Sequence, residues 1–216
     1  MKRLAVLLAA ALFSVAMIDA LLALPAAPID LRPAVMENLP ASGVAHPVTA
    51  VLLNYRGYDT LLEIAVLLLA LFGVLALGLE AREEAPHHGV PPLQWVARLA
   101  LPMMVLFAVY MLWAGAHRPG GAFQAGAVLG AAAVLLHLTG LLPGWEQPRL
   151  RLRFGLALGF LLFLGVSTAL LIDGGLLSYP PAWAGRLILL IESGLTVSLG
   201  LLLGGLFLFL SRKGGR

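Results

Sequence analysis

Ionisable side chains inside otherwise apolar stretches are the residues of this chain that could do chemistry. Glu192 stands in the apolar run Leu187–Leu210 beside Ser193, and Thr196 follows one helical turn later. A carboxylate is costly in lipid, so we expect it to face neighbouring helices, where it could hold a proton or a cation. A purely structural, hydrogen-bonded acid is the alternative interpretation.

A second group joins one basic and two acidic residues at the start of the run Leu61–Leu79. Arg56, Asp59 and Glu63 follow one another at intervals of three and four residues, which places them on one face of a helix. They predict either stations for ions or protons or a salt-bridge cluster at the membrane interface.

Two isolated residues are further candidates. His137 lies toward the end of the run Phe123–Leu142, where a neutral imidazole could relay protons or, more simply, anchor the helix end. Asp19 interrupts the run Leu4–Leu24 and faces either a partner or the headgroups.

A polar, glycine-rich turn separates two of the apolar runs. It comprises His117–Gly126, in which Pro119 fixes the backbone, Gly120 and Gly121 permit positive φ, and Phe123 and Gln124 open the next run. Its backbone amides could bind a carbonyl oxygen or an ion of a neighbour. A tight turn that only joins two helices is the alternative.

The elements that position these residues follow from composition. Hydrophobic residues make up 61% of the chain, charged residues 12%, and the mean hydropathy is +0.96, values outside the range of soluble globular proteins. About six runs approach the roughly 20 residues that a transmembrane helix needs. They are Leu4–Leu24, Leu61–Leu79, Trp95–Gly115, Phe123–Leu142, Leu152–Ile172 and Leu187–Leu210. The sequence therefore predicts an all-α, polytopic membrane helical bundle.

The distribution of the 14 Lys and Arg residues predicts the orientation. An even number of crossings puts both termini on one face, and that face receives Lys2, Arg3, Arg82, Arg98, Arg149, Arg151, Arg153, Arg212, Lys213 and Arg216. The other face receives only Arg32, Arg56, Arg118 and Arg186. We therefore expect both termini in the cytoplasm. The sequence pI of about 9.7 reflects this topology and does not indicate nucleic-acid binding.

The N-terminal run allows two interpretations. Lys2 and Arg3 followed by an apolar stretch resemble a signal peptide, with a poor cleavage region near Ala23–Ala26. We expect a retained crossing, because the apolar run continues past Asp19. The longest soluble stretch that remains is about Pro25–Thr60.

No constellation for catalysis emerges. The chain has no cysteine, which excludes thiolate chemistry and cysteine-held clusters within it. His87 and His88 fall on the face opposite His46 and His117, so these four histidines cannot share a metal. We expect no active site, metal or cofactor in this chain.

Three pairs of glycines, each at four-residue spacing, predict close helix packing. They are Gly126 and Gly130, Gly155 and Gly159, and Gly200 and Gly204. Lipid provides no hydrophobic drive between helices, so small residues that let backbones approach replace it.

Two motifs in the chain resemble one family. From about Trp95 to Leu210 the chain resembles the B subunit of the Mrp-type multisubunit cation/proton antiporters, which carries a Pro-Gly-Gly-Gly-Phe-Gln turn and an Ile-Glu-x-Gly-x-Thr-Val stretch. Pro119–Gln124 and Ile191–Val197 match, with Ala122 in place of the third glycine. From about Val48 to Gly78 it resembles the C-terminal part of the large A subunit, also found as a small membrane subunit of membrane-bound hydrogenases, with Asn54 where an Asp is usual.

The resemblance implies a membrane subunit of a multisubunit Na+/H+ antiporter, with Na+ and H+ as the transported ions. A membrane-arm subunit of an energy-converting hydrogenase or a related complex-I-like oxidoreductase is the alternative. It implies other membrane subunits as partners, a multi-pass place in the plasma membrane, and three parts: residues 1–80 like the A-subunit segment, a cytoplasmic linker at 81–94, and a four-helix B-like domain at 95–216.

Overall fold

The computed structural model describes residues 2–24, 30–76, 91–142, 150–172 and 174–210. Within these ranges the ordered elements are helices and no strand occurs, which confirms the all-α prediction. The chain divides into two compact units, Met1–Ala34 and Val35–Arg216, and each is described by itself. The first unit contains α1 (Lys2–Leu22).

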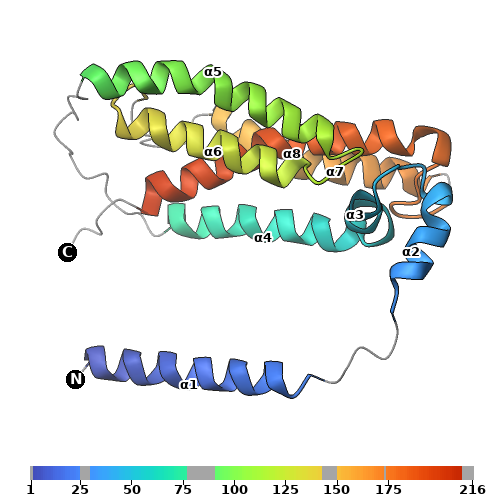
Figure 1. The fold of residues 1–216 in the computed structure, drawn as a ribbon, viewed down its shortest axis with the longest axis horizontal. Coiled ribbons are helices and arrows are strands. Elements are labelled where there is room, and N and C mark those ends of the chain that lie inside the picture. Colours follow the sequence, from blue (N-terminus) through green and yellow to red (C-terminus); the bar gives the residue numbers. More distant parts are fainter. Residues whose placement is uncertain (1, 25–29, 77–90, 143–149, 173, 211–216) are drawn as a thin grey trace. The chain divides into compact units, whose positions relative to one another are not determined.

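The second unit combines short helical segments with long apolar helices (Figure 1). The short segments are α2 (Arg32–Asn38, which begins in the first unit), the 3-10 helix η1 (Leu39–Ser42), α3 (Pro47–Thr49) and the π-helix η2 (Ala50–Tyr55). The long helices are α4 (Gly57–Ala76), α5 (Pro91–Ala114), α6 (Ala122–Leu138), α7 (Leu150–Leu171) and α8 (Pro181–Leu210). Figure 1 shows the long helices lying side by side.

Each predicted crossing corresponds to a helix, although the ends differ. The helices α4, α5, α7 and α8 are long and apolar enough to cross a membrane, whereas Val6–Leu22 of α1 and all of α6 are shorter apolar helices. Predicted to start at Leu187, α8 begins instead at Pro181, and α5 begins at Pro91 instead of Trp95. Proline is well suited to the first turn, because the amide it lacks would have no partner there.

The end of α6 was also predicted too late. It stops at Leu138 with Thr139 as its C-cap, and the next residue, Gly140, takes a φ of +70°. A left-handed glycine directly after the cap is a common helix terminator. The helix therefore has only 17 residues, or about 26 Å of length, which makes it shorter than its neighbours.

Contacts of α8 with α4, α6 and α7 place it at the centre of the second unit. Along α6, a Cβ added to Gly126 would lie 2.6 Å from the Cβ of Leu199, and one added to Gly130 would lie 3.1 Å from the Cβ of Leu203. The residue numbers of the contacting pairs rise together along both helices, so α6 and α8 run parallel. The predicted packing role of these glycines is confirmed.

On its other side α8 meets α7 just as closely. A Cβ added to Gly159 of α7 would lie 2.6 Å from Ser198 Oγ and 2.9 Å from the Cα of Leu195. A Cβ added to Gly155 would lie 2.6 Å from Leu201 Cδ1. The residue numbers of the contacting pairs therefore fall along α7 as they rise along α8. The two helices are therefore antiparallel, and their backbones nearly touch.

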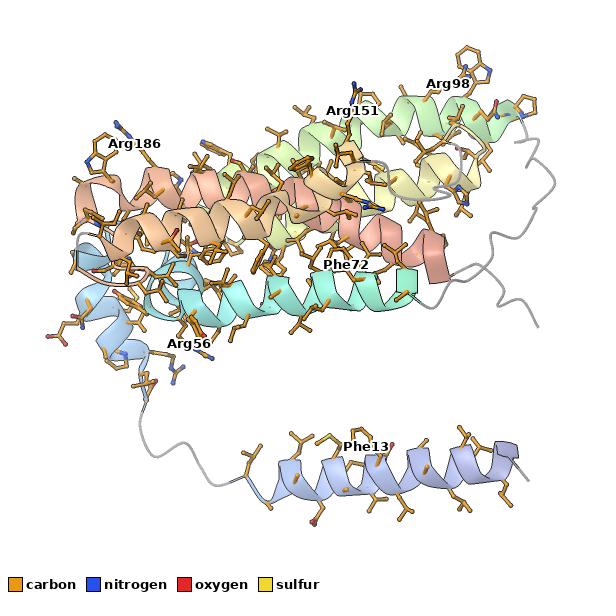
Figure 2. All side chains as sticks on the ribbon, turned by 180° about the vertical axis from the view of Figure 1, so that it is seen from behind. Phe13, Arg56, Phe72, Arg98, Arg151 and Arg186 are labelled. Carbon is orange, nitrogen blue, oxygen red and sulfur yellow. The ribbon has the colours of Figure 1, made fainter. Side chains whose placement is uncertain are left out.

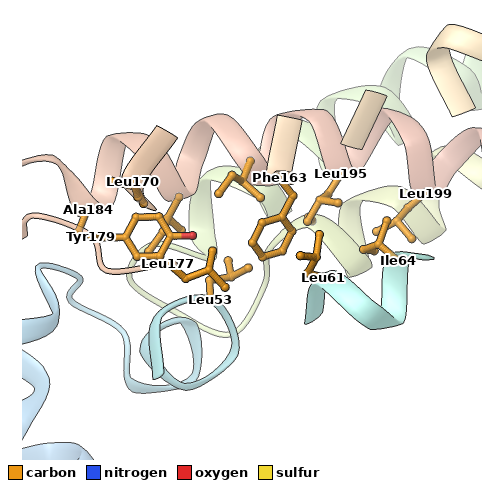
Figure 3. Packing of buried hydrophobic residues seen from close by; sticks show 13 residues of the cluster. Leu53, Leu61, Ile64, Phe163, Leu170, Leu177, Tyr179, Ala184, Leu195 and Leu199 are labelled. Carbon is orange, nitrogen blue, oxygen red and sulfur yellow. The ribbon is translucent and has the colours of Figure 1, made fainter. Parts of the chain in front are cut away.

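Apolar side chains fill the space between α4, α7 and α8 (Figure 3). The ring of Phe163 is fully buried and lies near Leu61 of α4 and Leu195 of α8, with Ile64 beside Leu199. A second cluster joins Leu68, Leu71, Leu156 and Leu202 farther along the same helices. This packing sets the position of α4 along the axis of α8.

Part of the stretch predicted to be soluble packs against the helix bundle. Thr49, Ala50 and Leu53 are buried, and Leu53 belongs to the main apolar cluster. The proline-rich stretch is therefore not a plain surface loop, because α3 and η2 pack into the helix bundle. Its place outside the bilayer stays a prediction.

The basic residues labelled on the second unit lie at different points along its length. Arg56 and Arg186 lie toward one end, Arg98 lies toward the other, and Arg151 lies between them (Figure 2). Arg98 and Arg186 each lie over a tryptophan ring, those of Trp95 and Trp183, at 5.7 Å and 5.2 Å from the ring centroids. The orientation prediction itself rests on the distribution of Lys and Arg in the sequence. Which end faces the cytoplasm, and whether α1 is retained, stay predictions.

Gly159→Val tests the close packing of α7 and α8. The added side chain meets the backbone of Leu195, so we expect the free energy of unfolding to fall by about 1–3 kcal/mol, seen as a lower thermal unfolding midpoint in detergent. Gly165→Val in the same helix is the matched control, since nothing lies within 4 Å of a Cβ at that position. Equal effects of the two variants would contradict the packing described here.

Candidate functional site

The candidate site centres on Glu192, which lies about three turns from the start of α8. The residue belongs to an otherwise apolar helix, and only 6% of it is exposed. The prediction that this carboxylate faces neighbouring helices is confirmed by its burial.

The side chain of Glu192 reaches the glycine-rich turn between α5 and α6. Gly121 takes a φ of +109°, and a Cβ added to it would lie 2.8 Å from Glu192 Oε1. Glycine at this position is therefore required twice, for the backbone conformation and for the space that the carboxylate occupies. Both residues are candidates from the sequence alone, but their contact with each other was not predicted.

At the start of α6 the carboxylate acts as a cap. The Ala122 backbone N–H donates to Glu192 Oε1 over 3.4 Å, and Gly121, the N-cap residue, offers no side chain of its own. The first amides of a helix lack partners within it and carry its positive dipole end. A carboxylate from another helix thus meets the positive end of α6.

The turn itself is held by backbone contacts. The N–H groups of Gly115 and Gly121 both donate to the carbonyl of Met111, at 3.2 Å and 2.8 Å. A Cβ added to Gly115 would lie 2.6 Å from the Cα of Gly121, so the two glycines are stacked against each other. The position of Gly121 beside Glu192 therefore depends on Gly115, a residue that the sequence motif did not include.

The polar neighbours of Glu192 in sequence do not hold its carboxylate. Thr196 Oγ1 donates to the carbonyl of Glu192 at 2.8 Å, and Ser193 Oγ donates to that of Leu189 at 2.7 Å. Hydroxyls in helices commonly bind the carbonyl one turn back. Within the described residues, the hydrogen bond recorded for the carboxylate is the one from Ala122.

Of the predicted group Arg56, Asp59 and Glu63, only the first two are recorded in contact with each other among the described residues. Arg56 Nε donates to Asp59 Oδ2 at 2.7 Å, and the two side chains form an ion pair that is 70% and 55% exposed. Such an exposed pair contributes little stability in water. Glu63 lies one turn later on α4 and is also exposed.

Of the remaining candidates, Gln124 lies close to Glu192, since a Cβ added to Gly121 would lie 3.9 Å from Gln124 Oε1 and 2.8 Å from Glu192 Oε1. His137 is in the last turn of α6, about 22 Å along that helix from Ala122. In the turn, Pro119 and Gln124 are exposed, while Phe123 packs against the main apolar cluster. Asp19 is exposed on α1 in the first unit. The histidines His87 and His88 and most of the predicted linker lie outside the described residues.

A buried threonine was missed as a site residue. Thr49 Oγ1 donates to the carbonyl of Gly115 at 2.7 Å, which joins α3 to the α5–α6 turn. Thr49 lies in the segment from about Val48 to Gly78 that resembles the A subunit, and that resemblance was the available signal. Its partner could not be read from the sequence, because the two residues are 66 positions apart.

Comparison with known proteins adds a family. The family model described as "Domain related to MnhB subunit of Na+/H+ antiporter" matches residues 92–208, more than half of the chain. The chain belongs to this MnhB-related family. The matched segment of the MnhB-related chain contains Glu192, Gly121 and the whole α5–α6 turn. No curated protein sequence matches the chain.

Two solved structures share the fold. A chain of the Mrp complex from Dietzia sp. DQ12-45-1b superposes with a TM-score of 0.72 at 22% identity, over 100% of the MnhB-related chain and 27% of the other. The MnhB-related chain thus spans about a quarter of that longer chain. A chain of the membrane-bound sulfane sulfur reductase (MBS), an archaeal respiratory membrane complex, superposes with a TM-score of 0.73 at 25% identity, over 98% and 99% of the two chains.

Gly121→Ala tests the contact between the turn and Glu192. The backbone conformation of Gly121 costs an alanine about 1–3 kcal/mol, and the new methyl also displaces Glu192 Oε1, so we expect a larger fall in thermal stability than strain alone gives. Gly174→Ala is the control, because Gly174 has a φ of +140° with nothing within 4 Å of an added Cβ. If both variants lose the same stability, the contact with Glu192 has no energetic weight.

Proposed function

We propose that this chain is a membrane subunit of a multisubunit antiporter that exchanges Na+ or another monovalent cation for protons. Membership of the MnhB-related family carries the proposal, because the matched residues 92–208 include the buried acid and the turn that meets it. The long apolar helices support a multi-pass membrane protein, and we place it in the plasma membrane.

Glu192 is the proposed ion station. Its carboxylate is buried and, among the described residues, receives one long hydrogen bond, from Ala122, so much of its capacity to bind a cation or a proton is left unused. One carboxylate cannot be protonated and also hold Na+ through the same charge. Binding of either ion at Glu192 therefore displaces the other, which is the requirement for exchange at a single site.

Glu63 is the second proposed station. It is exposed on the apolar helix α4, one turn from the exposed pair of Arg56 and Asp59. Charged side chains in membrane helices face polar partners or water and do not face lipid. We infer that this side of α4 lies against another subunit or a hydrated path. His137 and Asp19 stay candidates for proton relay, with a structural anchor as the alternative for each.

The chain works within a complex. Exposed apolar side chains cover α5, including Leu99, Met103 and Leu106, and they need lipid or other membrane subunits around them. We propose other membrane subunits as partners, a division into an A-like part, a linker and a B-like part, and no active site or cofactor in this chain, with Na+ and H+ as transported ions.

A membrane-arm role in a respiratory complex is the second candidate. The near-complete mutual coverage with the MBS chain favours it, since the two chains are of similar extent. Purifying the complex through a tag on this chain, followed by mass spectrometry, separates the candidates. Antiporter subunits alone support the first, whereas nickel–iron or iron–sulfur proteins among the stoichiometric members support the second.

Glu192→Gln is expected to abolish Na+-dependent proton flux in vesicles that contain the whole complex. The amide has nearly the shape of the acid, but it neither carries a proton nor provides a charge for Na+. Flux is followed with a pH-sensitive dye after a Na+ pulse. Glu37→Gln, at an exposed acid of α2, is the control and should leave the flux unchanged.

Unchanged flux in the Glu192→Gln complex, with subunits assembled normally, would remove Glu192 from the ion path. Loss of assembly in that variant would instead indicate the structural role that the sequence left open.

A further inference from the structure

The hydroxyl of Thr49 joins two segments that are 66 residues apart in the chain, whereas that of Thr60 in α4 reaches back eight residues to the carbonyl of Leu52. Thr139, Thr168 and Thr196 donate to carbonyls four residues back in their own helices, those of Leu135, Leu164 and Glu192. Thr49 Oγ1 instead crosses to the carbonyl of Gly115, at 2.7 Å. A hydroxyl that bypasses its own helix in favour of a distant segment fixes the distance between the two segments.

The contact is shielded from solvent. Thr49 is 8% exposed and Gly115 is buried, so a competing hydrogen bond from bulk water is restricted. Removing one partner of a buried hydrogen bond leaves the other partner unsatisfied, which is more costly than losing an exposed one. The Gly115 carbonyl therefore has a strong preference for the position that Thr49 sets.

From Gly115 the constraint passes directly to the candidate ion station. Gly115 and Gly121 are stacked, with a Cβ on the first only 2.6 Å from the Cα of the second, and both amides share the Met111 carbonyl. Gly121 lies against Glu192 Oε1, and the next amide, that of Ala122, donates to it. A shift of Gly115 must therefore move the groups that face the carboxylate.

We propose that Thr49 is a positioning residue for the Glu192 site, acting through Gly115 and Gly121. The inference rests on the proposed function, since it assigns Thr49 to the site at which cations and protons exchange. Through this bond the segment around α3 and η2, which resembles an A-subunit segment, sets the geometry of a site in the B-like part of the chain.

The test measures Na+-dependent proton flux over a range of Na+ concentrations in vesicles that contain the whole complex. Thr49→Val removes the hydroxyl at nearly constant volume, and we expect the Na+ concentration for half-maximal flux to rise about fivefold, the effect of losing one ordinary hydrogen bond. Thr49→Ser keeps the hydroxyl and should restore the value. Thr168→Val, which removes a hydroxyl bound only within its own helix, should leave it unchanged.

Thr49→Ala is made in parallel, because it lacks the hydroxyl without adding a methyl to a buried contact. An unchanged half-maximal concentration in either assembled hydroxyl-free variant would overturn the inference, as would a Thr49→Ser variant that behaves like Thr49→Ala. If Glu192→Gln abolishes flux while the Thr49 variants have no effect, only the positioning role fails. If Glu192→Gln has no effect, the ion station itself fails.

Discussion

The distance at which α6 can approach α8 governs most of this structure. Both helices run in the same direction, and glycines face each other across the contact: a Cβ added to Gly126 would overlap Leu199, and one added to Gly200 would overlap Leu129. In lipid such backbone proximity is the main source of attraction between helices, because apolar surface gains little by leaving hydrocarbon for protein. Larger side chains at these positions would separate the helices. They would also change which residue of α8 faces the start of α6.

The register set by that contact brings a carboxylate to a helix terminus. With Gly126 held against Leu199, the first amide of α6 lies within reach of Glu192, which is about two turns before Leu199 on α8. A helix start buried in an apolar bundle needs partners for its free amides, and the glycine N-cap has no side chain to supply one. Glu192 therefore has a structural reason to be at this point as well as a chemical one. The same geometry keeps the acid out of lipid and in contact with a positive dipole.

Sequence segments of different character converge on this point. The α5–α6 turn supplies stacked glycines, α8 supplies the acid, and α3 supplies the threonine hydroxyl that holds Gly115. The π-helix η2 follows α3 directly, and segments of this kind recur at functional sites because they depart from regular helical hydrogen bonding. By contrast, Asp59 and Glu63 of α4 are exposed, as is Arg56 just before that helix. The surface around them makes sense only with neighbouring subunits or water in place.

The sequence by itself determined where the helices lie in the chain and which small residues allow them to pack closely, because both depend on local composition. Bilayer thickness sets the length of an apolar run, and the paired glycines at 126 and 130 and at 200 and 204 mark close faces without reference to their partners. It also selected Glu192, since an acid in such a run must turn inward. Only the tertiary structure decided that Glu192 meets Gly121 and that Thr49 holds Gly115. Those contacts join residues far apart in the chain, and their distances follow from the register of packed helices, which no spacing within one helix encodes.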